Sequence, residues 1–164
     1  MSARNVRCHE LTREQRVSRP LDEVFSFFAD AANLEALTPP FLRFRILTPL
    51  PIEMKVDARI EYTLSLFGAP IHWRTRITEW EWGVRFVDEQ ESGPYALWHH
   101  THEFEADGDV TWVRDRVLYR EPMGLLGRLA HGLFVERTLN RIFDYRYRAI
   151  AERLAPPSPS GAST

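Results

Sequence analysis

Alternating apolar and polar residues, divided by short turn signals, dominate the middle of this chain. Every second residue is apolar in 60–66, and the alternation resumes in 71–77 after the turn-forming residues 67–70. A second strong turn signal, Ala-Asp-Gly-Asp at 106–109, divides two further runs. Period-two alternation is typical of half-buried strands, and short turns connect antiparallel neighbours. The sequence between 44 and 120 therefore predicts an antiparallel meander of six strands.

Helical periodicity lies before and after this meander. Segment 20–30 begins with a proline, which suits the first turn of a helix, and a second short helix is predicted at 31–37. A first strand precedes them at 6–17, and 125–154 is a long amphipathic segment. We therefore predict an α+β fold. A curved seven-stranded antiparallel sheet wraps around the long C-terminal helix, with two short helices between the first and second strands.

Length and composition fit one globular domain. The chain has 164 residues, of which 44% are hydrophobic and 27% charged, close to ordinary globular usage. The domain is predicted at 1–155, and the tail at 156–164 is predicted to be disordered because of its Pro, Ser, Gly, Ala and Thr content. The net charge is -2 and basic residues are interspersed with acids, so we expect no nucleic-acid partner.

The N-terminal and cysteine features favour the cytoplasm. Cys8 is the single cysteine, so it cannot form an internal disulfide, and the sequence assigns it no role. The first ten residues lack the apolar run of a signal peptide, and no segment approaches the about 20 apolar residues of a membrane span. We expect a cytoplasmic protein without a membrane span, and a homodimer stays open.

Hairpin register decides which side chains share a face, because a slip of one residue reverses both faces. Taking 107–108, 68–69 and 81–82 as central turn residues places most apolar residues opposite apolar ones. The predicted partners are Phe104 and Thr111, His102 and Val113, His100 and Asp115, Trp98 and Val117, Tyr62 and Thr75, and Ile77 and Phe86.

Polar residues on the inward face form the candidate site. They are Tyr62, Thr75, Asp88, Gln90, His100, His102 and Asp115. A buried carboxylate needs a partner, and in this register His100 faces Asp115 with about 5 Å between their Cβ atoms. Such a pair is more often a satisfied core contact than a catalytic one. In the functional alternative it lines a cavity, where it orients a ligand or moves a proton.

The histidines at 99, 100 and 102 do not predict a metal site. His99 points away from the other two along a strand. His100 and His102 share a face, but the register offers Asp115 as the one convincing further ligand. The sequence also lacks G-x-S-x-G, glycine-rich phosphate-loop, H-E-x-x-H and C-x-x-C motifs. We therefore expect no metal and no cofactor.

Several segments resemble the START-like, or SRPBCC, ligand-binding superfamily. Segment 20–40, Pro-Leu-Asp-Glu-Val-Phe-Ser-Phe-Phe-Ala-Asp-Ala-Ala-Asn-Leu-Glu-Ala-Leu-Thr-Pro-Pro, is similar to its helical hairpin. Segments 86–95, 98–104, 114–120, 124–137 and 141–146 resemble its polyketide cyclase/dehydrase-like and coenzyme-Q-binding-like branch. The resemblance implies the helix-grip fold and the binding of lipids, quinones, polyketides, steroids or plant hormones. A minority of members are cyclases or hydrolases, and no shared catalytic set exists to carry over.

We expect a protein that binds a small hydrophobic molecule, such as a lipid, quinone or polyketide, between the sheet and the C-terminal helix. The expected pocket residues are Phe44, Ile46, Tyr62, Leu64, Trp73, Thr75, Phe86, Asp88, Trp98, His100, His102, Asp115, Val117, Leu133 and Phe134. The early glycines of the long helix, at 124, 127 and 132, are expected to act as a gate.

Two alternatives to simple binding stay open. One is a cyclase/dehydrase-type enzyme in which His100 or His102 acts as the base and Asp115 orients it. The other is an interaction module that binds no ligand and whose interior is solidly packed.

Overall fold

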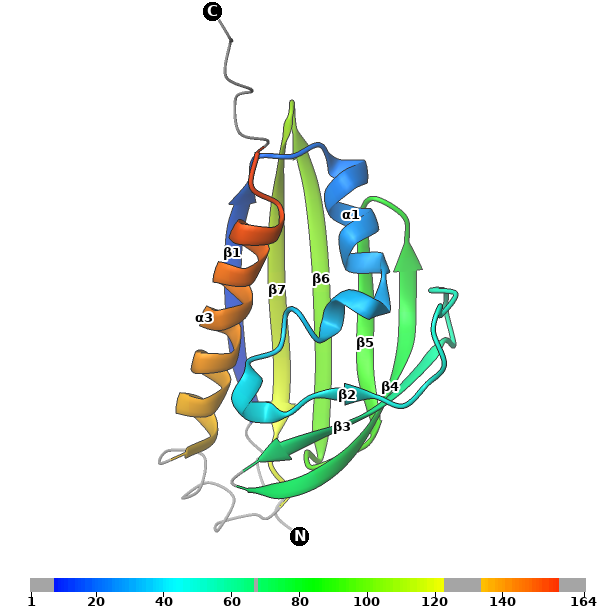
Figure 1. Cartoon of the computed structure of the whole chain (residues 1–164), viewed down its shortest axis with the longest axis vertical. Coiled ribbons are helices and arrows are strands. Elements are labelled where there is room, and N and C mark those ends of the chain that lie inside the picture. Colours follow the sequence, from blue (N-terminus) through cyan, green and yellow to red (C-terminus); the bar gives the residue numbers. More distant parts are fainter. Residues whose placement is uncertain (1–7, 67, 123–133, 157–164) are drawn as a thin grey trace, which may run out of the picture.

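The computed structural model describes residues 8–66, 68–122 and 134–156 (Figure 1). In chain order the elements are β1 (His9–Val17), α1 (Leu21–Ala29), the 3₁₀ turns η1 (Ala31–Leu34) and η2 (Pro40–Leu42), β2 (Arg45–Ile46), β3 (Arg59–Leu66), β4 (Ala69–Glu81), β5 (Arg85–Ser92), β6 (Leu97–Asp107), β7 (Val110–Arg120) and α3 (Glu136–Arg153). This order confirms the predicted α+β organisation.

The seven strands form one antiparallel sheet in the order β1-β7-β6-β5-β4-β3-β2. Strands β3 to β7 lie side by side in sequence order, as their short turns predict; β2 lies beside β3 after the longer connection 47–58, and β1 pairs with β7. Figure 1 shows the sheet curving, with α3 along β1 and β7 and with α1 across from it, over β6. A curved sheet around a C-terminal helix confirms the predicted helix-grip fold.

The helical segments differ in extent from the prediction. The second helix, expected at 31–37, is the single turn η1, and η2 was not predicted. The proline pair at 39–40 ends the first helical region, and proline at the start of η2 suits a new short turn. The structure describes α3 from Glu136, so the glycines of the predicted gate lie outside the described residues.

The turn between β6 and β7 lies one position later than predicted. Asp107 pairs with Val110, so Gly108 and Asp109 are its central residues. Gly108 has a φ of 62°. Glycine with positive φ at the first central position is typical of a type II′ turn, whose twist matches that of the strands. The β6–β7 register therefore differs from the prediction by two residues.

A shift of two residues leaves every side chain on its predicted face but changes its partner. The predicted pairing of His100 with Asp115 was wrong, as was that of His102 with Val113. The β3–β4 hairpin also shifts by two residues, but in the opposite direction, because Leu66 pairs with Ala69. The observed pairs are Phe104 with Val113, His102 with Asp115, His100 with Val117, Trp98 with Tyr119, and Tyr62 with Trp73.

The β4–β5 pair is irregular. Phe86 lies opposite Trp80, and Ile77 lies opposite Asp88, so the predicted Ile77–Phe86 pair was also wrong. The register shifts between Arg74 and Thr75 and again between Ile77 and Glu79. Such bulges bend a strand and increase its twist, and the alternation of apolar residues does not reveal them. They help this long strand to curve around the space beneath α3.

Three groups of buried side chains surround that space. Phe25 of α1 packs edge to face on Phe86 and Phe104 under one end of the sheet. The second group joins β1 and β7 to α3, and the third lies near η2. Their buried members are Leu11, Val117, Tyr119, Leu139 and Phe143, and Leu42, Leu64 and Trp73, respectively. The groups leave a cavity between the sheet and α3.

Candidate functional site

The cavity between the sheet and α3 has a volume of about 180 Å³. A buried water needs only about 10–15 Å³, so this space is far larger than a packing defect. Its walls come from α1, η1, η2, strands β3 to β6 and α3. Of the predicted pocket residues, those that line it are Phe44, Tyr62, Leu64, Trp73, Thr75, Phe86, Asp88, Trp98, His100 and His102.

The other predicted pocket residues lie elsewhere. Ile46 belongs to the outermost strand, and Val117 is fully buried in the core between the sheet and α3. Phe134 is 54% exposed, and Leu133 lies outside the described residues. Asp115 lies behind the cavity wall, beside a much smaller cavity. Ile46, Asp115, Val117 and Phe134 were therefore wrongly placed in the pocket lining, because periodicity gives the face of an element but not its distance from the cavity.

Several lining residues were not singled out from the sequence. They include Phe28, Leu37, Leu42, Tyr95, Leu139, Ile142, Phe143 and Arg146. The apolar stripe of the C-terminal helix contains Ile142 and Phe143, but the stripe alone does not say which members reach the cavity. Arg146 carries no sequence signal at all, because a basic residue on an amphipathic helix is ordinarily solvated.

Four aromatic side chains form one wall of the cavity. Trp73 stacks on Tyr62 with 5.9 Å between ring centroids and meets Trp98 edge-on at 5.2 Å. Tyr95 lies 5.6 Å from Trp73 and 5.0 Å from Trp98. Burial raises the pKa of Tyr62 and of Tyr95, so both phenols stay neutral. Among the described residues, the buried indole N–H of Trp73 has no hydrogen-bond partner.

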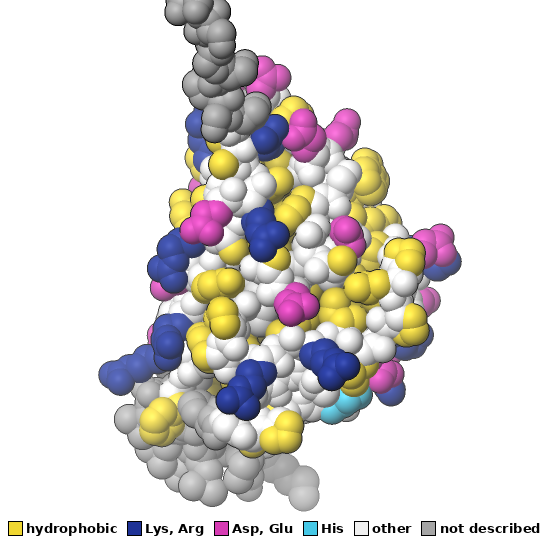
Figure 2. Space-filling model, in the orientation of Figure 1, with side chains coloured by type: hydrophobic (Ala, Val, Ile, Leu, Met, Phe, Trp, Pro, Cys, Tyr) yellow, Lys and Arg dark blue, Asp and Glu magenta, His cyan; other side chains and the backbone are white. Residues whose placement is uncertain are grey.

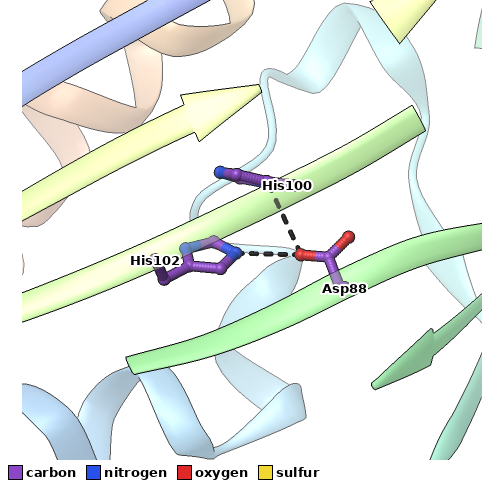
Figure 3. Close-up of side chains that lie close together, drawn as sticks. All are labelled: Asp88, His100 and His102. Atoms are coloured by element: carbon purple, nitrogen blue, oxygen red, sulfur yellow. Dashed lines mark hydrogen bonds and ion pairs between the residues drawn. The ribbon is translucent and has the colours of Figure 1, made fainter. Parts of the chain in front are cut away.

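Two histidines and an aspartate meet where β5 and β6 form the cavity wall (Figure 3). The Nε2 atom of His102 is 2.9 Å from Oδ2 of Asp88, and Nδ1 of His100 is 3.5 Å from the same oxygen. His100 and His102 are two residues apart on β6 and therefore share a face. Asp88 lies directly opposite His100 on β5. Both imidazoles are buried, with exposed fractions of 6% and 3%.

Asp115 on β7 contacts the same histidines from behind the cavity wall. Its Oδ1 atom is 3.0 Å from Nε2 of His100 and 2.9 Å from Nδ1 of His102. Arg146 of α3 forms an ion pair with its other oxygen at 3.5 Å. The expected contact between His100 and Asp115 thus exists, although it is diagonal across the strands. Each imidazole lies between two carboxylates.

Burial and neighbouring charges act in opposite directions on this cluster. Burial acts to raise the pKa of Asp88 and Asp115, but the histidines and Arg146 outweigh it, so both carboxyl pKa values are lowered, that of Asp115 strongly. Burial, and then the neighbouring His102, lower the pKa of His100. Burial also acts to lower the pKa of His102, but hydrogen bonds to Asp115 and Asp88 raise it overall. The pKa values of the two adjacent imidazoles are therefore shifted in opposite directions.

This arrangement allows three kinds of chemistry at one place. The ring nitrogens can hydrogen-bond a ligand carbonyl or hydroxyl, or exchange a proton with it. One donor atom from each of Asp88, His100 and His102 also lies within 4.8 Å of the other two, a spacing at which the three side chains could hold a cation.

No protein-family model and no curated protein matches this sequence. Among the described residues, no helix is both long enough and apolar enough to cross a bilayer.

Solved structures resemble nearly the whole chain. The Zhui aromatase/cyclase from Streptomyces sp. R1128 has a TM-score of 0.75 at 13% identity, covering 96% of this chain and 100% of that one. The protein TTHA0849 from Thermus thermophilus has a TM-score of 0.68 at 19% identity, covering 92% and 100%. A START superfamily protein from Mycobacterium smegmatis has a TM-score of 0.65 at 12% identity, covering 89% and 97%. These likenesses establish a START/SRPBCC-like helix-grip fold, the fold that the sequence resemblance implied.

Proposed function

We propose that this chain binds a small hydrophobic molecule in the cavity between the sheet and α3. The observation that carries the proposal is the cavity itself, whose walls are largely apolar and include the cluster of Asp88, His100 and His102. Binding sites for small molecules commonly combine an apolar enclosure with a few placed polar groups. The helix-grip fold supports the same class, because it is a hydrophobic-ligand-binding fold.

The wall chemistry favours a planar ligand that carries oxygen atoms. Trp73, Trp98, Tyr62 and Tyr95 offer ring faces and edges for stacking. The unpartnered N–H of Trp73 gains a hydrogen bond if a ligand carbonyl or hydroxyl accepts from it. Among lipids, quinones and polyketide-like molecules, these groups favour the latter two.

Native mass spectrometry of the purified protein tests this proposal directly. Solvent extraction and identification of any bound molecule then name the ligand class. We expect a co-purifying compound with a planar, oxygen-bearing part. Protein that is empty and also fails to bind a fluorescent hydrophobic probe contradicts the proposal.

A cavity-filling variant locates the binding site. Leu64 lines the cavity, whereas Leu47 is 46% exposed and does not line it, so Leu64→Trp and Leu47→Trp form a matched pair. We expect Leu64→Trp to weaken probe binding more than about tenfold, because the larger side chain occupies the ligand's space. Leu47→Trp should bind like wild type. Equal binding by both variants would place the probe outside the cavity.

Proton-transfer catalysis in the same cavity is the second candidate function. The observation that favours it is geometric: His100 and His102 line the cavity while their ring nitrogens contact carboxylates. A histidine held by a carboxylate and facing a bound ligand is a common general base. One structure of the same fold, the Zhui protein, is an aromatase/cyclase.

Deuterium exchange next to a ketone carbonyl tests the catalytic candidate. With α-tetralone as the probe, wild type should accelerate exchange at the carbon beside the carbonyl, and His102→Gln should remove the acceleration. His99→Gln is the matched control, because His99 pairs with Glu89 and does not line the cavity. Exchange at the uncatalysed rate with bound tetralone argues for binding alone.

The cavity also bears on the alternative of an interaction module that binds no ligand. A solidly packed interior, which the interaction module requires, fits poorly with a cavity of this size. Figure 2 shows basic and acidic side chains interspersed on the face in view, as the charge pattern of the sequence predicts. The lack of a nucleic-acid partner, the cytoplasmic location, the homodimer, the domain limits and the absence of a cofactor stay predictions.

A further inference from the structure

The side chains of Asp88, His100 and His102 converge on one point of the cavity wall (Figure 3). The distances from Asp88 Oδ2 to the nearer nitrogens of His102 and His100 are 2.9 and 3.5 Å. Ligands at the corners of a tetrahedral zinc site, with bonds of about 2.1 Å, lie about 3.4 Å apart. The observed spacing is therefore close to what one shared cation requires.

A second carboxylate holds the far side of both rings. Asp115 Oδ1 lies within 3.0 Å of the ring nitrogen of His100 that faces away from Asp88, and 2.9 Å from the corresponding nitrogen of His102. Metal-binding histidines usually donate their other N–H to such a carboxylate, which fixes the ring orientation. Asp115 itself forms an ion pair with Arg146 and does not line the main cavity. It therefore contacts the two imidazole rings from behind the cavity wall.

Neighbouring aromatic rings restrict the two imidazoles further. Phe86 stacks on His102 with 4.1 Å between ring centroids, and Phe143 meets His100 edge-on at 5.5 Å. Both rings are therefore held by packing contacts as well as by Asp115. Preorganised donors of this kind need little rearrangement on binding.

We propose that Asp88, His100 and His102 bind one divalent transition-metal ion, with a fourth coordination position open to the cavity. The sequence expectation of no metal rested on the absence of a convincing ligand besides Asp115. In the structure Asp88 supplies that ligand, and Asp115 takes the supporting position. His99 stays apart, as expected, because it contacts Glu89 at 2.8 Å and does not line the cavity.

The donor set indicates the class of ion. Two imidazoles and one carboxylate suit zinc and, among redox-active ions, ferrous iron, whereas calcium and magnesium prefer oxygen donors alone. A site with three protein ligands leaves a position for water or for an oxygen of a bound molecule. The open position faces the cavity, so an oxygen-bearing occupant of the cavity completes the coordination.

Calorimetric titration of chelator-treated full-length protein with Zn²⁺ tests the site. We expect one ion per chain, and we expect Asp88→Asn and His102→Gln to weaken binding more than about tenfold. His99→Ala is the matched control. It also removes a histidine of β6 that contacts a carboxylate, but this contact lies outside the cavity. It should bind within about twofold of wild type. Wild type that binds no zinc overturns the proposal, as does equal binding by all four proteins.

A second test uses wild type alone, so its result does not depend on whether variants of buried residues fold. Zinc addition should shift the imidazole nitrogen NMR signals of His100 and His102. The signals of the other four of the six histidines should stay unchanged. Shifts confined to other histidines overturn the proposal. Both tests use protein from which any co-purifying organic molecule has been removed, so their outcome does not depend on whether the cavity binds a hydrophobic molecule.

Discussion

Asp115 links three ionisable side chains of the core. It contacts His100, His102 and Arg146, and it is 6% exposed. In Asp115→Asn the Arg146 guanidinium, whose side chain is only 11% exposed, loses its carboxylate, and breaking a buried ion pair in this way typically costs about 3–5 kcal/mol. We expect denaturant unfolding at pH 7 to show a loss of this order. A loss below about 1 kcal/mol would mean that Asp115 is not the partner that makes this cluster stable.

The same variant should respond differently to acid. Because the folded-state pKa of Asp115 lies below its unfolded value of about 4, its stabilisation is complete above that value and is lost as the pH falls through the folded-state pKa. His100 and His102 from β6, Arg146 from α3 and Arg13 from β1 lie around this carboxyl group.

We therefore expect the difference in unfolding free energy between wild type and Asp115→Asn to shrink below about pH 4. Denaturant titrations over a pH series, in the presence of a chelator, measure this difference without any contribution from a metal. A difference that stays constant down to the lowest pH of folding would contradict the prediction.

Trp73 should select ligands that carry oxygen. Its N–H is buried without a partner among the described residues, so an accepting ligand gains a hydrogen bond worth about 1 kcal/mol. In Trp73→Phe we expect 1,4-naphthoquinone to bind about fivefold more weakly relative to naphthalene, measured by fluorescence titration. Naphthalene serves as the internal control because it accepts no such bond. An unchanged ratio of the two affinities would show that the indole N–H does not meet the ligand.

At the residue scale, the sequence predicted the sheet face on which a side chain lies better than it predicted the cross-strand partner of that residue. Asp88, His100 and His102 were placed together on the inward face, and they remain there because a register shift of two residues preserves the face. The contacts of Asp88 with the two histidines were not predicted, because they depend on the β5–β6 register as well as on the irregular β4–β5 pair. Arg146 could not be predicted, since only the docking of α3 brings it to Asp115.

At the element scale, the β6–β7 hairpin depends on its glycine. Gly108 has a φ of 62°, and a Cβ atom added there would meet nothing within 4 Å, so backbone strain is the only cost of a side chain. Gly108→Ala should therefore destabilise the fold by about 1–2 kcal/mol. Asp109→Ala, at the second central position, is the control and should change stability much less. Equal midpoints in thermal unfolding would contradict this account of the turn.

Elements with strong periodicity were predicted well, and their irregularities were not. The alternation of apolar residues located six consecutive strands, and the helical spacing located α1 and α3. The bulges of β4 and the turn η2 arise where the chain curves around the cavity, so they depend on tertiary packing. Local sequence contains no signal for such curvature.

At the scale of the whole molecule, occupation of the cavity should stabilise the fold. A ligand that binds only the folded state adds about 2.7 kcal/mol at one hundred times its dissociation constant. Thermal unfolding of wild type with saturating ligand should therefore show a higher midpoint, whereas Leu64→Trp, whose cavity is partly filled, should show little change. A similar rise in both proteins would indicate binding elsewhere.

The overall architecture was accessible from sequence, and the shape of its interior was not. One apolar sheet face and one long amphipathic helix leave few arrangements, so an antiparallel sheet covered by that helix followed from the elements, and the START-like resemblance implied the helix-grip fold. The cavity depends on how closely α3 approaches the sheet and on side chains such as Phe28 and Leu37, which enter from the segment before β2. Distances of this kind are set by the assembled core.

The pairing of β1 with β7 has a consequence for how the chain acquires its structure. Strands β2 to β7 each pair with a neighbour in sequence, whereas His9 of β1 must find Tyr119 of β7. Closing so long a loop costs more entropy than forming a hairpin, and distant pairings slow folding. During synthesis β1 leaves the ribosome before the other six strands of the sheet and has no partner until β7 has emerged. We therefore expect β1, although it is made before them, to be among the last strands of the sheet to reach its place.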